Sequence, residues 1–229
     1  MKVPTKLKNY RQHFEELVDE LDGHSSIDIV ELEFGEPASE ETLRLVQEQL
    51  GGPLPWELKA FYRELNGFKV RWVLRAAEEL SEELELEVPE DHCLTLLPLL
   101  PPRGGHESRI HQRGVLDGWQ ATIWQEEADE RRLLRPIDCF TDETCAALFP
   151  LPGKSPLVQL YNFTDRTLQD TGRSFAQYLA LALQSRGFWF WPASLTEESQ
   201  DREEVEAFRT AMPVIFPDYD DDLFQPPDY

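Results

Sequence analysis

The histidines and cysteines come closest to a known catalytic motif. Residues 106–111 read His-Glu-Ser-Arg-Ile-His, which is similar to the HExxH motif of zinc proteases. That motif places its histidines four residues apart on a helix, so both side chains reach one metal ion. Here His106 and His111 are five residues apart, which places them on different faces of a helix. The spacing argues against zinc catalysis, and we expect no metal site.

The three cysteines also lack the spacing of a metal or redox motif. Cys93, Cys139 and Cys145 stand at irregular intervals without a CxxC pair. Cys139 lies beside apolar residues, which favours an ordinary buried thiol. A cysteine nucleophile would need a histidine that lowers its pKa, and the sequence alone leaves this alternative open.

Other ligand-binding motifs are incomplete. The glycine pairs at 51–52 and 104–105 lack the lysine and the helix start of a phosphate-binding loop. The run Asp218–Asp222 resembles the beginning of a calcium loop but lacks its glycine and its distal glutamate. We therefore expect no cofactor, and an enzyme is kept only as a third functional hypothesis.

The charge distribution is the most informative feature of the sequence. The 229 residues include 44 acidic and 22 basic side chains, which give a net charge of -22. Such a field repels nucleic-acid phosphates and anionic membrane surfaces, and it attracts basic proteins. We expect a basic protein partner, and neither nucleic acid nor a membrane.

Two stretches carry most of this charge. Residues 78–91 contain eight acids and no base, and residues 197–229 contain eleven acids and two bases. The partner-binding residues that we predict within them are Glu82, Glu83, Glu85, Glu87, Asp220, Asp221 and Asp222. The alternative is that both stretches are solvated surfaces that only keep the protein soluble.

The chain also lacks the signals of export. No apolar run follows the polar first eight residues, and no segment has the apolar length that spans a bilayer. Together with the odd number of cysteines, this favours free thiols in a reducing, cytoplasmic location. The sequence leaves the oligomeric state open.

Hydrophobic periodicity predicts helices towards both ends of the chain and strands between them. The expected helices cover about residues 5–22, 39–50, 55–65, 171–187 and 197–212. The expected strands cover 27–34, 70–74, 94–100, 115–125 and 157–163, with a break of phase between Ile29 and Leu32. Residues 78–87 fit either a short acidic helix or a loop. Trp56 is expected on the buried face of its helix, and Ser174 with Gln177 forms a capping box.

The C-terminal region adds an aromatic run and an acidic end. Phe188–Trp191 are expected to pin the extension that follows them to the domain, with an exposed partner surface as the alternative. The segment around Asp218 and Asp220 contains prolines and acids, so we expect a poorly ordered tail.

The stretch from Gly35 to Gly67 resembles the SUKH superfamily, which includes the yeast cell-wall-synthesis regulator and many bacterial immunity proteins. The matching pieces are Pro37-Ala38-Ser39-Glu40-Glu41, Leu50-Gly51, Leu54-Pro55, Phe61-Tyr62, Leu65-Asn66-Gly67, Leu157–Phe163 and Ser174–Leu183. The resemblance implies an α+β domain, in which helices pack on one face of a mixed, mostly antiparallel sheet. We expect this domain over residues 1–190, with its core at about 34–187 and an added N-terminal helix. Residues 191–229 then form an acidic extension with one helix and a loose tail.

The same resemblance implies a binding protein without catalysis. It suggests an immunity protein that covers the active or substrate-binding surface of a cognate basic toxin, such as a nuclease. An acidic surface can occupy a basic nuclease site as a mimic of nucleic acid. The alternative is a regulatory scaffold that binds several partners weakly through its tail.

Overall fold

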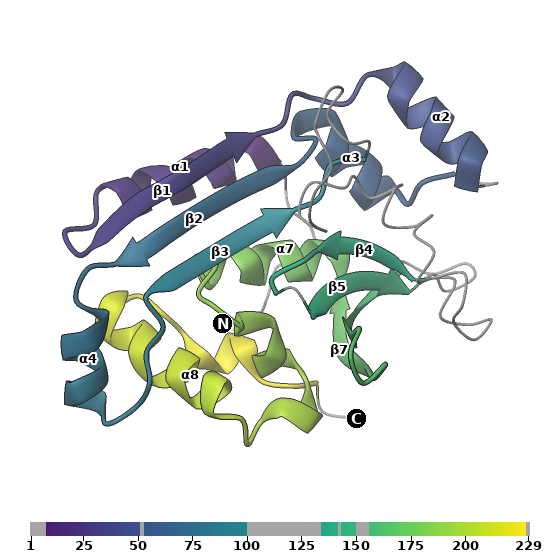
Figure 1. The fold of residues 1–229 in the computed structure, drawn as a ribbon. Coiled ribbons are helices and arrows are strands. Elements are labelled where there is room, and N and C mark those ends of the chain that lie inside the picture. Colours follow the sequence, from purple (N-terminus) through teal and green to yellow (C-terminus); the bar gives the residue numbers. More distant parts are fainter. Residues whose placement is uncertain (1–7, 51–52, 100–133, 142, 150–155, 228–229) are drawn as a thin grey trace.

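The described part of the protein forms an α+β fold around one seven-stranded sheet (Figure 1). The computed structural model describes residues 8–50, 53–99, 134–141, 143–149 and 156–227. Its strands are β1 (Ile27–Phe34), β2 (Phe68–Leu74), β3 (Asp91–Leu96), β4 (Arg135–Asp138), β5 (Thr144–Phe149), β6 (Leu157–Asn162) and β7 (Leu168–Ser174). They lie side by side in sequence order, and every neighbouring pair is antiparallel. The α+β prediction is confirmed, with a described sheet that is antiparallel throughout rather than mixed.

The sheet has two parts that meet at a short junction between β3 and β4. Leu96 lies opposite Asp138, and the backbone N–H of Leu97 donates to the carbonyl of Ile137 at 2.8 Å. Figure 1 shows β4 and β5 set at an angle to β1, β2 and β3. The junction lets one sheet curve around a shared core.

The helices surround this sheet. They are α1 (Tyr10–Asp22), α2 (Glu40–Leu50), α3 (Trp56–Glu64), α4 (Ala77–Leu84), α7 (Phe175–Gln184) and α8 (Glu203–Ile215), with the 3₁₀ helices η3 (Trp191–Leu195), η4 (Glu197–Ser199) and η5 (Asp221–Phe224). Helices α1, α3 and α7 contact one another behind the sheet in Figure 1. Phe61 of α3 packs edge-on against Phe14 of α1 and Phe175 of α7, with ring centroids 6.3 and 5.6 Å apart. None of the described helices is long and apolar enough to cross a membrane.

Local sequence signals account for several element boundaries. The Ser39 hydroxyl accepts a hydrogen bond from the Thr42 backbone N–H at 3.0 Å, which caps α2. The predicted capping box of Ser174 and Gln177 is present at the start of α7. The break of phase in the first strand is a β-bulge between Ile29 and Glu31.

Other predictions differ from the structure or fall outside the residues that it describes. The helix expected from residue 171 begins at Phe175, because Leu168–Ser174 pair with β6 as strand β7. Trp56 is 53% exposed rather than buried, since it occupies the first turn of α3 at the edge of the core. The strand expected over residues 115–125 lies outside the described residues.

The C-terminal segment packs against the domain. Phe188, Trp191 and Phe224 are completely buried, so the aromatic run does pin the extension to the core. Residues 216–227 therefore differ from the poorly ordered tail that their acids and prolines predict. Their buried aromatic side chains supply enough apolar contact to order the segment.

Candidate functional site

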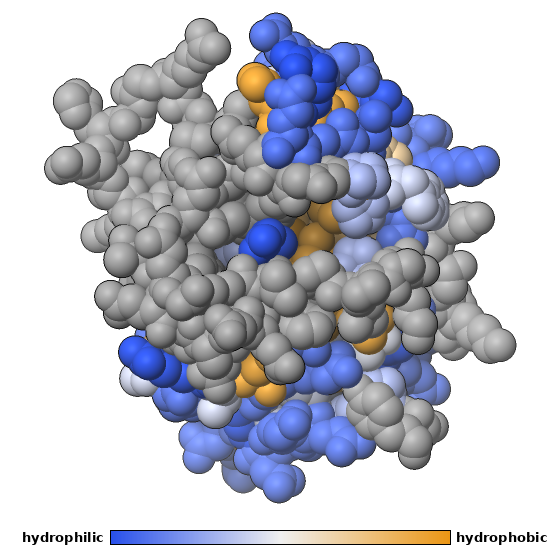
Figure 2. All heavy atoms as spheres, turned by 90° about the vertical axis from the view of Figure 1, so that its right-hand side faces the viewer, coloured by the Kyte–Doolittle hydropathy of each residue, from blue (hydrophilic) through white to orange (hydrophobic). Residues whose placement is uncertain are grey.

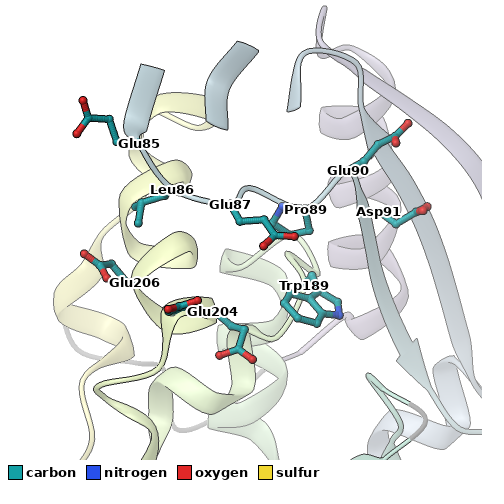
Figure 3. Close-up of a pocket in the computed structure, with 10 residues that line it drawn as sticks. Glu85, Leu86, Glu87, Pro89, Glu90, Asp91, Trp189, Glu204 and Glu206 are labelled. Atoms are coloured by element: carbon teal, nitrogen blue, oxygen red, sulfur yellow. The ribbon is translucent and has the colours of Figure 1, made fainter. Parts of the chain in front are cut away.

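An acidic cleft of about 840 Å³ lies between the segment that joins α4 to β3 and the first turn of α8 (Figure 3). Its lining residues are Glu85, Leu86, Glu87, Pro89, Glu90, Asp91, Trp189, Glu203, Glu204 and Glu206. Seven of these ten residues carry a carboxylate, and none is a lysine, arginine or histidine. The two acidic stretches of the sequence thus face each other across one cavity.

The wall formed by residues 85–91 is shaped by a sharp turn after α4. Glu85 adopts a left-handed conformation with φ of 54°, which ends the helix. The Ser81 hydroxyl then accepts a hydrogen bond from the Val88 backbone N–H at 3.0 Å. Val88 itself is buried and anchors the segment in the core. These contacts leave the side chains of Glu85 and Glu87 exposed, and Figure 3 shows that Glu87 points towards Trp189 whereas Glu85 points outward.

The opposite wall is the amino-terminal turn of α8. The partial positive charge of a helix amino terminus favours acids there, which reduces the cost of placing Glu203, Glu204 and Glu206 together. Arg202 pairs with Glu204 at 3.1 Å, and this hydrogen-bonded guanidinium lowers the pKa of the Glu204 carboxyl. Within the described ranges, Glu204 is the only acid of the cleft that has an ion-pair partner.

The floor of the cleft is the half-buried indole of Trp189 (Figure 3). The Trp189 backbone N–H donates to Nδ1 of His92 at 3.0 Å. His92 is completely buried and stacks on Trp72, with ring centroids 3.9 Å apart. Burial lowers the pKa of His92 to about 3, and the nearby Pro89 carbonyl opposes this only in part. His92 is therefore neutral, and because its Nδ1 accepts a hydrogen bond, the ring proton is on Nε2.

The structure divides the sequence-predicted residues among three places. Glu85 and Glu87 line the cleft. Glu82 and Glu83 lie exposed on α4, and Glu83 borders a separate hollow of about 370 Å³. Asp220, Asp221 and Asp222 lie at η5, outside the lining of either cavity.

The η5 acids have interactions within the fold. Asp221 pairs with Arg209 at 3.3 Å and accepts a hydrogen bond from the Tyr219 hydroxyl at 3.0 Å. The Asp220 side chain accepts from the Asp222 backbone N–H at 3.2 Å, which caps the short helix. These contacts give Asp220 and Asp221 a structural role in holding the C-terminal segment.

Sequence reasoning did not single out Trp189 or the acids of α8. Trp189 belongs to an aromatic run that predicts burial as a whole, and its neighbours Phe188 and Phe190 are indeed buried. Glu203, Glu204 and Glu206 follow the ordinary pattern of acids in a first helical turn. Only their position opposite residues 85–91 distinguishes them, and no local signal reports it.

The cysteines form no site with the histidines in the described part of the chain. Cys139 and Cys145 are buried, and burial raises the pKa of the Cys145 thiol. His92 precedes Cys93 in sequence, but its ring packs in the core against Trp72. Across the described residues, no group of three or more potential ligands is placed to hold a metal ion. His106 and His111 lie outside the described residues.

Comparisons with known proteins add no evidence for function, so the cleft is the main evidence. No family model matches this chain, and no curated protein matches it significantly.

Proposed function

We propose that this protein binds a positively charged segment of another protein in the acidic cleft. The observation that carries the proposal is the convergence of seven carboxylates in one cavity that, among the described residues, no basic side chain lines. Like charges held close together repel each other, and a basic ligand relieves this repulsion on binding. The surrounding negative field accelerates the encounter with such a ligand.

We propose that the protein acts by covering a basic surface of its partner, through shape and charge, rather than by catalysis. A partner whose own function depends on a basic surface would lose access to its substrate once that surface is seated on the cleft. The resemblance to SUKH immunity proteins makes a basic toxin, for example a nuclease, the partner that we propose. The scaffold alternative relied on a flexible tail, but Leu223 and Phe224 are buried against the domain.

A charge-matched pair of variants tests the cleft. The first carries Glu87→Gln, Glu90→Gln, Glu203→Gln and Glu206→Gln. The control removes four exposed charges from α1, β1 and α2 through Asp19→Asn, Asp22→Asn, Glu33→Gln and Glu41→Gln. Both variants have the same net charge, so a difference between them reports the position of the charges rather than their number.

Affinity capture from the native lysate, at low and then high salt, provides the readout. The proposal predicts a stoichiometric basic protein that binds the wild type and the control, dissociates at high salt, and is lost from the cleft variant. Equal capture by both variants contradicts the proposal. Truncation of residues 200–229 is not a clean test, because it removes the completely buried Phe208 and Phe224 from the core.

A further inference from the structure

We infer that the cleft recognises arginine, with the guanidinium stacked on the Trp189 indole and hydrogen-bonded to carboxylates of the two walls. This inference rests on the proposed function and specifies which side chain of the basic partner enters the cavity. Figure 3 shows the indole on the floor, with Pro89 and Glu87 above it and the acidic first turn of α8 beside it. A guanidinium can bind to an aromatic face through a cation–π interaction and to carboxylates through charge-assisted hydrogen bonds, and the cleft offers both kinds of group.

The protein itself uses this arrangement for its own arginines. Three described cases are Arg11 over Phe34 with Glu15, Arg186 over Phe216 with Glu20 and Asp218, and Arg202 over Phe190 with Glu204. Their guanidinium carbons lie 5.4, 4.8 and 4.6 Å from the ring centroids. The cleft offers the same two components, an aromatic ring and carboxylates, and none of the described residues that line it is an arginine.

Trp189 is a stronger platform than the phenylalanines of these internal cases. The indole has the most electron-rich face of the protein side chains, so a cation placed over it gains the most. Arginine fits better than lysine, because its planar fork stacks on a ring while it donates in its plane to carboxylates. A lysine ammonium would also be attracted by the negative charge of the cleft, but it has no planar group that stacks on the indole.

His92 acts as a positioning residue for this platform. Its Nδ1 fixes the Trp189 backbone, and the stack on Trp72 fixes the imidazole in turn. The imidazole is itself completely buried, so close packing limits its movement. The contact therefore fixes the backbone from which the indole projects below the cleft.

Calorimetric titration with a hexa-arginine peptide tests the inference, with hexa-lysine as a ligand of equal charge. Trp189→Leu removes the π face, Trp189→Phe keeps a weaker one, and Trp56→Leu is the control on an exposed tryptophan outside the cleft. We expect Trp189→Leu to weaken hexa-arginine binding on the order of 3- to 30-fold, with Trp189→Phe in between. Trp56→Leu should bind as the wild type does, and hexa-lysine should bind more weakly and depend less on Trp189.

The possible failures are distinguishable. If the four-glutamine cleft variant loses hexa-arginine binding while Trp189→Leu retains wild-type affinity, the cleft functions but the arginine platform is wrong. Equal affinity of the wild type for the two peptides, with equal dependence on Trp189, also overturns the preference for arginine. If the cleft variant binds hexa-arginine as well as its charge-matched control, the proposed function itself fails. Near-ultraviolet circular dichroism of each variant separates lost binding from lost folding.

Discussion

The backbone N–H of Trp189 donates to Nδ1 of His92 at 3.0 Å, which joins the floor of the acidic cleft to the interior of the sheet. The chain of contacts continues inward, since His92 stacks on Trp72 and the Trp72 indole donates to the Arg186 carbonyl at 2.7 Å. The cleft is therefore attached to the buried interior of the fold. Figure 2 shows a different face, on which the described surface is mostly hydrophilic with small hydrophobic areas.

Replacement of His92 should affect stability and its dependence on acid. His92→Phe keeps a ring on Trp72 but leaves the Trp189 N–H without its acceptor, at a cost of roughly 1–3 kcal/mol. The folded-state pKa of about 3 lies below the unfolded value, so neutral His92 stabilises the protein above pH 6.5. This contribution is lost as pH falls from 6.5 towards 3. Urea unfolding from pH 3 to 8 should show a weaker acid dependence in His92→Phe than in the wild type.

Asp138 should produce the opposite pH dependence. Its side chain is completely buried at the end of β4 and accepts a hydrogen bond from the Tyr178 hydroxyl at 2.8 Å. Burial raises its pKa to about 7, although the Tyr178 hydroxyl and the Thr95 backbone lower it in part. The folded-state pKa exceeds the unfolded value near 4, so this stabilisation is complete below pH 4 and is lost as pH rises through 7.

The Asp138→Asn variant tests this assignment. The amide cannot ionise but can still accept from Tyr178, so the variant should be more stable than the wild type at pH 8 by up to roughly 4 kcal/mol. The two proteins should converge near pH 4. The exposed Asp165→Asn serves as the control and should leave the pH profile between 5 and 8 unchanged. A destabilised Asp138→Asn at pH 8 would mean that the ionised carboxylate is favourable in the fold.

Arg186 should contribute strongly to the stability of the C-terminal segment. Its guanidinium is 2% exposed, bonds to Glu20 at 2.8 Å and Asp218 at 2.6 Å, and lies over Phe216. Arg186→Met removes both ion pairs and the cation–π contact, and we expect a loss of about 2–3 kcal/mol. Arg44→Met, which breaks an exposed pair within α2, should cost less than about 0.5 kcal/mol. Denaturant midpoints of the two variants provide the comparison.

Phe224 should hold the acidic end of the chain on the domain. The side chain is completely buried and packs against Trp191, Phe208 and Tyr219. Phe224→Ala should destabilise the protein by roughly 3–5 kcal/mol and expose the end of the chain to limited proteolysis. Asp222→Asn, two residues away and exposed, should change neither property. Wild-type stability of Phe224→Ala would show that the segment does not need this contact.

Local sequence signals predicted much of the secondary structure. The caps formed by Ser39 and Ser174 depend on residues within one helical turn, so they are readable without the fold. The break of alternation in the first strand coincides with the register shift between Ile29 and Glu31, although the sequence did not predict a bulge there. Strand β7 was missed because Leu168–Ser174 has weak alternation, and its pairing with β6 decides its conformation.

The sequence also located the two acidic stretches that form the cleft, but it did not show that they meet. Strands β3 to β7 lie between Glu87 and Glu203 in the sequence, and their packing brings the two walls of the cleft together. The amino-acid composition does not show how these strands pack. Trp189 lies at the floor with its backbone held by His92, which is far away in sequence. The segment of residues 216–227 packs on the domain for the same reason, since Phe224 contacts Trp191 and Phe208. Charge, caps and periodicity are local properties that the sequence determines, whereas burial and proximity arise from long-range packing and are decided by the tertiary structure.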